Sequence, residues 1–244
     1  MSGSLVLKEL KRRRLPLVLG LFVAVAWIPA ALLLAPGPLE DPLAWYAALC
    51  LRPLLVLGCA AAAALFAAVL RGDWTRGTAE FLLAKPWSRT SFFLGKALAG
   101  LAVIAAPNAA AYLSGMASLT FLCEREWSVG AFLALSLDAF LPMSVFAGAA
   151  LLASLLLPGT RSIKTPAVAL TLACFLPDAL TWADGAGVPA AAGLLAPLRW
   201  AGLEAACAGP TLARTAVPAA LAVALFAASL AVFRRKDVPE REAP

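Results

Sequence analysis

The chain contains no histidine, and none of its five cysteines forms a Cys-x-x-Cys pair. These two residue types supply most protein ligands of zinc and haem, so their scarcity argues against a metal site of the usual kind. Histidine is also the commonest general acid or base in catalysis. Charged residues are scarce as well, at 14% of the chain against about a quarter in soluble domains. Little polar chemistry is left for an active site within the chain.

Apolar residues are abundant instead: 62% of the 244 residues are hydrophobic, and the mean hydropathy is +0.87. A soluble protein of this size could not bury so much apolar surface, whereas a lipid bilayer covers it. We therefore expect residues 1–244 to form a single transmembrane domain of the all-α class. The apolar stretch from Leu15 is long and has no clear small-residue cleavage site, so we interpret it as a retained first span rather than a signal peptide.

Six apolar stretches have the roughly 20 residues that a helix needs to cross a bilayer. The predicted transmembrane helices cover residues 15–35, 48–70, 92–122, 128–157, 165–183 and 214–233. The third and fourth are longer than a bilayer requires, so each is expected to tilt, to kink or to begin along the membrane surface. Pro107 and Pro142 are the expected kink sites, because proline removes a backbone donor from its helix.

Lysine and arginine gather on one side of these predicted spans. With the N-terminus inside, sixteen of the twenty basic residues are cytoplasmic: Lys8, Lys11, Arg12, Arg13, Arg14, Arg71, Arg76, Lys85, Arg89, Lys96, Arg161, Lys164, Arg234, Arg235, Lys236 and Arg241. The positive-inside rule therefore places both termini in the cytoplasm, in a protein of the inner (cytoplasmic) membrane. The net charge of +6 then faces anionic lipid, so it requires no nucleic-acid partner.

Two segments are expected to lie along the membrane rather than across it. Near the N-terminus, Val6, Leu7 and Leu10 share one helical face opposite charged residues, which predicts an amphipathic interfacial helix. A disordered basic anchor that only sets the orientation is the alternative. On the outer side, the Gly-, Ala- and Pro-rich segment 184–213 is interrupted by Pro197 and by charges, so a re-entrant or interfacial hairpin is expected.

The cytoplasmic loop between the second and third predicted spans, residues 71–90, reads RGDWTRGTAEFLLAKPWSRT. Its pattern predicts a short helix between two breaks. Thr78 can cap the start of this helix, and Glu80 places negative charge in its first turn. Pro86 ends the helix, and Ser88 can cap the next one as the chain returns to the membrane.

Three apolar residues, Phe81, Leu82 and Leu83, lie within this loop although it is predicted to face the cytoplasm. An exposed apolar knob with a charged rim is what a protein docking element needs. The same residues could instead dip into the headgroup layer of the membrane. The physical pattern alone does not separate these two interpretations.

The loop resembles the signature of ABC-2 type permeases at residue level. The resemblance lies in Gly77-Thr78-Ala79-Glu80-Phe81-Leu82-Leu83, followed by Pro86, Ser88 and Arg89 and then by Gly95-Lys96. It implies six spans and an exporter, with the loop as a coupling helix that docks on a nucleotide-binding subunit. The residues implied in that coupling are Gly77, Thr78, Glu80, Phe81, Leu82, Leu83, Pro86, Ser88 and Arg89.

The resemblance also implies partners. The chain has no Gly-x-x-x-x-Gly-Lys-Ser/Thr phosphate loop, so the ATPase must be a separate subunit, and ATP and magnesium would bind there. Permeases of this kind work in pairs with a pair of ATPases. A homodimer, or a heterodimer with a homologous permease, is therefore expected, and no cofactor is expected on this chain itself.

Polar residues within the predicted spans are few. Asp138 could line a transport pathway, or it could lie at the outer headgroups if residues 128–137 form an interfacial helix. Asn108 is expected to satisfy a carbonyl freed by the kink at Pro107. Cys123 and Cys207 both face outward in this topology, where a disulfide between them could form.

Three other classes of function compete with a transporter subunit. An intramembrane enzyme would need a constellation of polar residues that the spans lack. A secondary carrier often shows internal repeats, and none is evident. A non-transporting scaffold with the same six helices is compatible with the sequence, which does not identify a substrate.

Overall fold

The computed structural model describes Lys11 and residues 14–33, 46–70, 88–123, 129–157, 164–175 and 212–235. Within these ranges every regular element is a helix and no strand occurs, which confirms the predicted all-α class. Three predicted features lie mainly outside the described residues. They are the amphipathic helix near the N-terminus, the loop through residue 87 and the outer segment from residue 184 to residue 211.

The described helices lie close to the six apolar stretches of the sequence. They are α2 (Arg14–Leu33), the π-helix η1 (Tyr46–Leu51), α4 (Arg52–Val69), α7 (Arg89–Cys123), α8 (Val129–Leu156), α9 (Lys164–Cys174) and α13 (Leu212–Arg235). The Leu- and Ala-rich composition favours helix, and each helix is apolar over most of its length. Since an α-helix rises about 1.5 Å per residue, α4 is about 27 Å long and α7 about 52 Å.

Four of these helices are long and apolar enough to cross a membrane. The qualifying segments are Arg52–Val69, Arg89–Phe121, Phe132–Leu156 and Thr215–Arg235. In α2 the apolar part that qualifies by composition is shorter, Gly20–Ala30. Helix α9 has 11 residues, and the rest of the predicted fifth span, residues 176–183, lies outside the described part of the chain.

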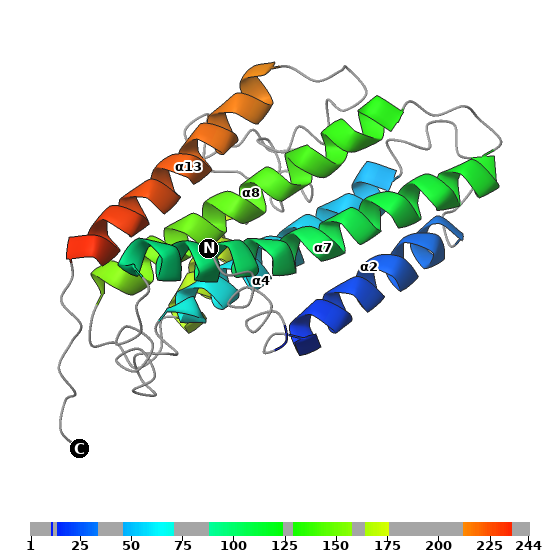
Figure 1. The fold of residues 1–244 in the computed structure, drawn as a ribbon. Helices are drawn as coiled ribbons and strands as arrows, with labels where there is room; N and C mark the ends of the chain where they lie inside the picture. The colour runs from blue at the N-terminus through cyan, green and yellow to red at the C-terminus, as the bar shows by residue number, and fades with distance from the viewer. Residues whose placement is uncertain are drawn as a thin grey trace.

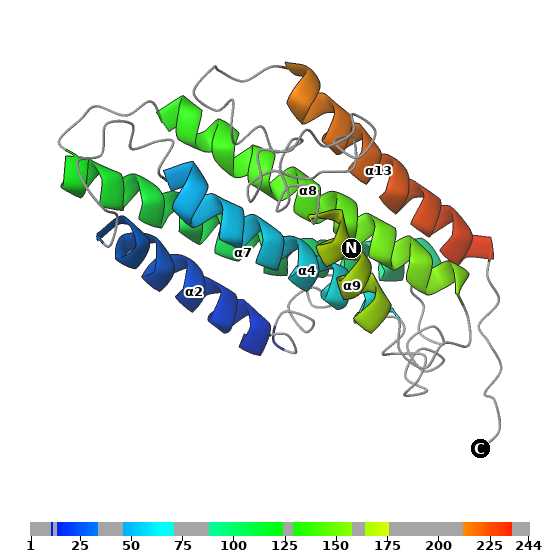
Figure 2. The same cartoon turned by 180° about the vertical axis from the view of Figure 1, so that it is seen from behind.

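Helices α4, α7, α8 and α13 run side by side as a bundle (Figure 1). Helix α8 is central to it, because it packs extensively on both α4 and α13. Helix α2 packs on α7 at the edge of the bundle, and α9 packs on α4, as the view from behind shows (Figure 2). The chain thus places the start of α7 and the end of α13 at the same end of the molecule (Figure 1).

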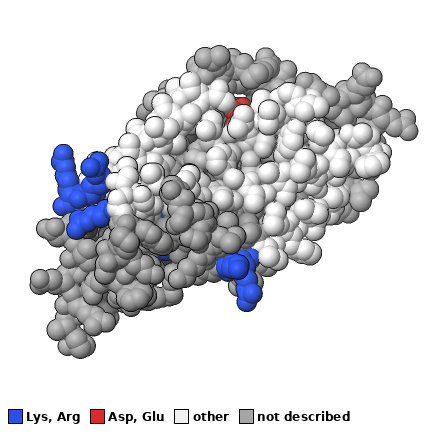
Figure 3. Space-filling model, viewed as in Figure 1, with Lys and Arg blue, Asp and Glu red and all other residues white. Residues whose placement is uncertain are grey.

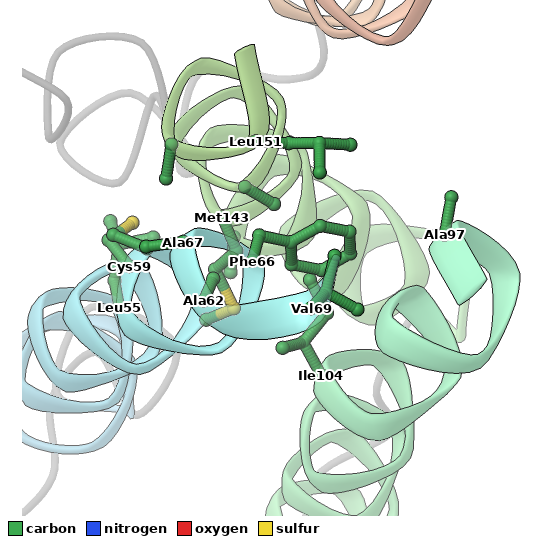
Figure 4. Packing of buried hydrophobic residues seen from close by; sticks show 14 of the residues in the cluster. Leu55, Cys59, Ala62, Phe66, Ala67, Val69, Ala97, Ile104, Met143 and Leu151 are labelled. Carbon is green, nitrogen blue, oxygen red and sulfur yellow. The ribbon is translucent and has the colours of Figure 1, made fainter. Parts of the chain in front are cut away.

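The core of the bundle is built around Phe66 of α4. Figure 4 shows its ring between Leu151 of α8 and Ile104 of α7, and the ring also meets Phe226 of α13 edge to face at 5.6 Å between centroids. Four helices therefore contribute to one cluster of buried side chains. The approach of α4 to α7 is close enough to require glycine at position 100, since a Cβ there would lie 2.6 Å from the Phe66 ring.

Pro107 and Pro142 lie inside α7 and α8, and both helices continue through them. Neither proline ends its helix, because each can be tolerated inside a membrane helix when neighbouring groups compensate for the missing backbone donor. Pro107 also packs closely on α2, where its Cγ would lie 2.8 Å from a Cβ at Gly20. The bends expected at the two prolines stay a prediction.

Exposed basic side chains gather at one end of the bundle, where α13 ends, and a second group lies where α2 begins (Figure 3). Two helix termini with exposed basic residues meet at the first of these places: Arg89 starts α7, Arg234 and Arg235 end α13, and the rings of Phe92 and Phe93 contact Phe233. We call this end of the molecule the basic end. Uncharged atoms cover most of the remaining described surface in this view (Figure 3).

Candidate functional site

The basic end contains the two attachment points of the loop 71–87. Before the loop, Val69 and Leu70 are buried in the core at the end of α4. After the loop, Ser88 and Arg89 are exposed at the start of α7. The other predicted coupling residues lie outside the described residues: Gly77, Thr78, Glu80, Phe81, Leu82, Leu83 and Pro86. Of the predicted docking element, the structure therefore describes the last two residues and both flanking helices.

Ser88 caps α7, as its position before the helix predicts. Its Oγ accepts a hydrogen bond of 3.1 Å from the backbone N–H of Ser91, and the two hydroxyl oxygens lie 2.8 Å apart. The carbonyl of Ser88 accepts the first helical hydrogen bond, 3.0 Å from the N–H of Phe92. These bonds satisfy N–H groups that a helix start otherwise leaves without partners. The helix therefore begins sharply where the loop ends.

A cluster of aromatic rings anchors the first turns of α7 to the end of α13. Phe92 stacks on Phe233 with ring centroids 6.2 Å apart, and Phe93 meets the same ring at 5.5 Å in a tilted arrangement. All three rings are buried. Such contacts contribute about 0.5–1.5 kcal/mol each beyond the area that they bury. Phe233 directly precedes the exposed Arg234 and Arg235 that end α13.

Lys96 belongs to this cluster and is the largest polar side chain buried in it. Only 1% of its surface is exposed, and its Nζ lies 5.6 Å from the centroid of the Phe92 ring. The two residues stand one helical turn apart, so the ammonium group folds back over the ring face. Cation–π attraction strengthens where water is excluded. We call Phe92, Phe93, Lys96 and Phe233 the basic-end clamp.

The basic-end clamp was not predicted from the sequence. In the sequence, Lys96 is one of many basic residues expected on the cytoplasmic side and is part of the family signature. The spacing of Phe92 and Lys96 at i and i+4 was the available signal for a ring–ammonium contact. The contribution of Phe233 has no comparable signal, because it lies about 140 residues away in the sequence.

Asp138 is half-buried in α8, and it is the only acidic residue within the described ranges. Its neighbour Leu137 is 47% exposed, whereas Ala139 on the other side is fully buried. The residue lies six positions inside the candidate span that begins at Phe132, which corresponds to a depth of about 9 Å. Its predicted place in a transport pathway stays a prediction.

Asn108 connects α7 to α8. Its Nδ2 donates to the carbonyl of Ser136 at 2.9 Å and lies 3.0 Å from the Ser136 hydroxyl oxygen. The expectation that Asn108 satisfies a carbonyl freed by Pro107 is wrong, because that carbonyl would be on α7 itself, four residues before the proline. The side chain crosses to the neighbouring helix instead, where a polar group in an apolar interior finds its partner.

A comparison with protein-family models matches residues 41–183 to the ABC-2 family transporter proteins. The matched region covers more than half of the chain and includes η1, α4, the loop, α7, α8 and α9. The chain belongs to the ABC-2 transporter family. No match is found among curated proteins.

The matched region contains the loop and three residues of the basic-end clamp, Phe92, Phe93 and Lys96. An ABC-2 permease is a membrane transport component that is not itself catalytic. The permease is thus a multi-pass membrane protein of an ABC transporter. Permeases of this family normally pair with an ABC ATPase.

The cysteines of this ABC-2 permease do not assemble into a site within the described residues. Cys50 and Cys59 are buried free thiols in η1 and α4, and Cys174 is a half-buried free thiol that ends α9. In the same ranges no three His, Cys, Asp or Glu side chains come together in a way that could hold a metal ion. The predicted Cys123–Cys207 pair falls outside the side chains that the structure describes.

Proposed function

We propose that this ABC-2 permease is the membrane-spanning half of an exporter whose energy comes from a separate ATPase subunit docked on residues 77–89. The observation that carries the proposal is the construction of the basic end. The matched loop runs from a buried residue, Leu70, to a capped helix start at Ser88. A push on such a loop moves two packed helices rather than a free connection.

In the proposed topology the permease crosses a bacterial inner membrane six times, and both termini lie on the cytoplasmic side. The exposed arginines of the basic end support this orientation, because basic residues are retained on the cytoplasmic side. The same residues would face anionic lipid headgroups there. In this orientation the loop 77–89 is accessible to a soluble ATPase.

In the proposed mechanism, the chemistry of ATP and magnesium belongs to the partner ATPase, and this chain supplies a docking surface and moving helices. Phe81, Leu82 and Leu83 would provide the apolar area that is buried against the ATPase. Glu80 and Arg89 would contribute to the polar rim of that contact. Closure of the ATPase pair on nucleotide would then displace the loop and, through it, α4 and α7.

A second permease copy or a homologous permease completes the proposed assembly, because a pair of ATPases needs a docking loop on each side. The substrate route would run between the two permeases, and Asp138 is the candidate polar residue along it. Its half-buried position within an apolar span supports this role, since ionisable groups in membrane spans are costly and are usually functional.

The test combines Glu80→Lys with Leu82→Asp in the full-length permease. The double variant should insert into the membrane as the wild type does, but it should lose the ATPase during purification and lose permease-dependent ATP hydrolysis in liposomes. A matched control is Lys236→Glu, which reverses a cytoplasmic charge in the C-terminal tail and should leave both properties unchanged.

Normal retention of the ATPase by the double variant would contradict docking on this loop. Crosslinking from residue 82 that captures only lipid, together with the absence of any nucleotide-hydrolysing partner, would favour a non-transporting scaffold instead. Transport driven by an ion gradient without ATP would favour a secondary carrier.

A further inference from the structure

The positive-inside rule explains why a lysine stands at the cytoplasmic end of α7, but it does not explain why Lys96 is buried. A lysine near the end of a membrane helix normally extends its long side chain toward water. Lysine is almost never fully buried unless its charge is compensated. Here the side chain turns inward, is 1% exposed and places its ammonium group over Phe92. This conformation costs desolvation that an apolar residue at the same position would avoid.

The location of Lys96 connects it to both sides of the basic end. It lies two turns into α7, which begins directly after the loop. Its ring partner Phe92 stacks on Phe233, and Phe233 is followed by the last two residues of α13. Lys96, Phe92 and Phe233 thus form one continuous set of contacts from the helix that leaves the loop to the helix that ends the bundle.

Helix α13 has few other ties to α7. It packs mainly on α8, and only a small part of its surface meets α7. Of its candidate span, 22% is buried, against 50% for the span in α7. The basic-end clamp is therefore where a displacement of α7 can be passed directly to α13.

We propose that Lys96 is a positioning residue that makes α7 and α13 move as one unit when the loop is displaced. The proposal rests on the proposed function, because the displacement is attributed to the docked ATPase. The ammonium group fixes the orientation of the Phe92 ring, and the fixed ring holds Phe233 in register. Without the charge, the rings would still bury their area but could slide past each other.

Two substitutions separate this role from simple packing. Lys96→Met keeps the length and removes the charge. The thermal midpoint of the purified Lys96→Met permease serves to confirm that the variant is folded. Lys96→Arg keeps the cation and should preserve the coupled movement, since guanidinium also binds aromatic faces.

The experiment measures distances between spin labels on Leu94→Cys in α7 and Ala231→Cys in α13. It uses the full-length permease bound to its ATPase in liposomes, with the five native cysteines replaced. Both labelled positions are exposed on the described helices. In the chain with Lys96, the distance should form one narrow population both without nucleotide and with ATP and vanadate.

In Lys96→Met, a second population at longer distance should appear with ATP and vanadate. The ratio of short to long distances should fall by about tenfold, which corresponds to about 1.4 kcal/mol of lost coupling between the two helices. Lys96→Arg should restore the single population. An unchanged distance in a folded Lys96→Met variant would overturn the proposal and leave Lys96 as a packing residue.

Failure of the proposed function has a different signature. If the wild-type permease retains no ATPase, docking fails and the inference about Lys96 fails with it. If the ATPase binds and hydrolyses ATP normally, while Lys96→Met and the wild type give the same distances in both nucleotide states, only the inference about Lys96 is overturned.

Discussion

The hydroxyl of Tyr46 donates a hydrogen bond of 3.1 Å to the carbonyl of Ala111, 65 residues further along the chain. The bond joins η1 to the middle of α7, and both residues are buried. The Tyr46 ring also packs against Phe132 of α8 at 5.2 Å between centroids. A single aromatic side chain thus fixes the segment before α4 to two helices of the bundle.

Tyr46→Phe should lower the stability of the permease by about 1 kcal/mol, because it removes this hydrogen bond and keeps the ring. Thermal unfolding of the purified protein in detergent measures the effect. Tyr112→Phe is the matched control, since the Tyr112 ring packs on the same Phe132 but the side chain is only half-buried. Equal midpoints for Tyr46→Phe and the wild type would show that the bond does not contribute.

Gly100→Ala should destabilise the bundle by about 1–3 kcal/mol, because its Cβ would lie 2.6 Å from the ring of the fully buried Phe66. Adding Phe66→Leu should restore part of the loss by vacating the space. Gly130→Ala serves as the control, since Gly130 is exposed near the start of α8 and alanine is the better helix former. Phe66→Leu also removes core packing of its own, so additive losses in the two single variants and the double variant would contradict the steric explanation.

Asn108→Leu should weaken the contact between α7 and α8 by about 0.6 kcal/mol, the average for side-chain hydrogen bonds between membrane helices, and by no more than about 1.7 kcal/mol. Ser136→Ala should cost less, because the Ser136 carbonyl that accepts the bond at 2.9 Å remains in place. A double-mutant cycle on thermal stability checks both values. Additive effects of the two substitutions would mean that the Ser136 hydroxyl does not contribute and that the bond to the Ser136 carbonyl carries the interaction.

Ser88→Ala should cost about 1 kcal/mol through loss of the cap on α7, whereas Ser88→Asp should retain the cap. Ser88→Ala and Ser88→Asp also test the proposed docking of the ATPase on residues 77–89. If the cap is what matters, ATPase retention should fall in Ser88→Ala and stay normal in Ser88→Asp. Loss of the ATPase from both variants, with α7 intact by thermal stability, would instead indicate that the serine hydroxyl itself contacts the ATPase.

The extent of the helices was predictable from the sequence, because it depends on the length of apolar runs and on local chemistry. The cap at Ser88 belongs to this class, since a serine directly before the helix and its partner Ser91 are three residues apart. Contacts that depend on the rotation of one helix against another were not predictable. Asn108 was assigned a partner on its own helix, whereas its partner Ser136 is on α8.

The burial of Lys96 escaped prediction for a related reason. A hydropathy profile treats every lysine as a residue that seeks water, and the positive-inside rule counts it only as a cytoplasmic charge. Lys96 is buried where Phe92 and Phe93 of α7 meet Phe233, a residue of a helix that is distant in sequence. The residues of the loop itself, from Gly77 to Pro86, owe their assignment to the family signature and to physical pattern.

The last prediction concerns Asp138, which was expected to lie either in a transport pathway or at the outer headgroups. These two locations differ in whether water reaches residue 138 alone or also its neighbour Leu137. In a transport pathway, the residue at 138 meets water while its lipid-facing neighbour Leu137 does not. At the headgroup layer, both positions meet water. Asp138 lies six residues inside the candidate span, so we expect Asp138→Cys to react with a membrane-impermeant maleimide from the outer side and Leu137→Cys to remain unlabelled.

Val129→Cys is the positive control for that labelling, since Val129 starts α8 and is exposed. Labelling of all three positions would place the start of α8 at the headgroups and remove Asp138 from the pathway. Labelling of Val129→Cys alone would exclude water from position 138 on the outer side. With selective labelling of position 138, Asp138→Asn should reduce permease-dependent ATP hydrolysis in liposomes, because a pathway residue affects turnover whereas a headgroup residue does not.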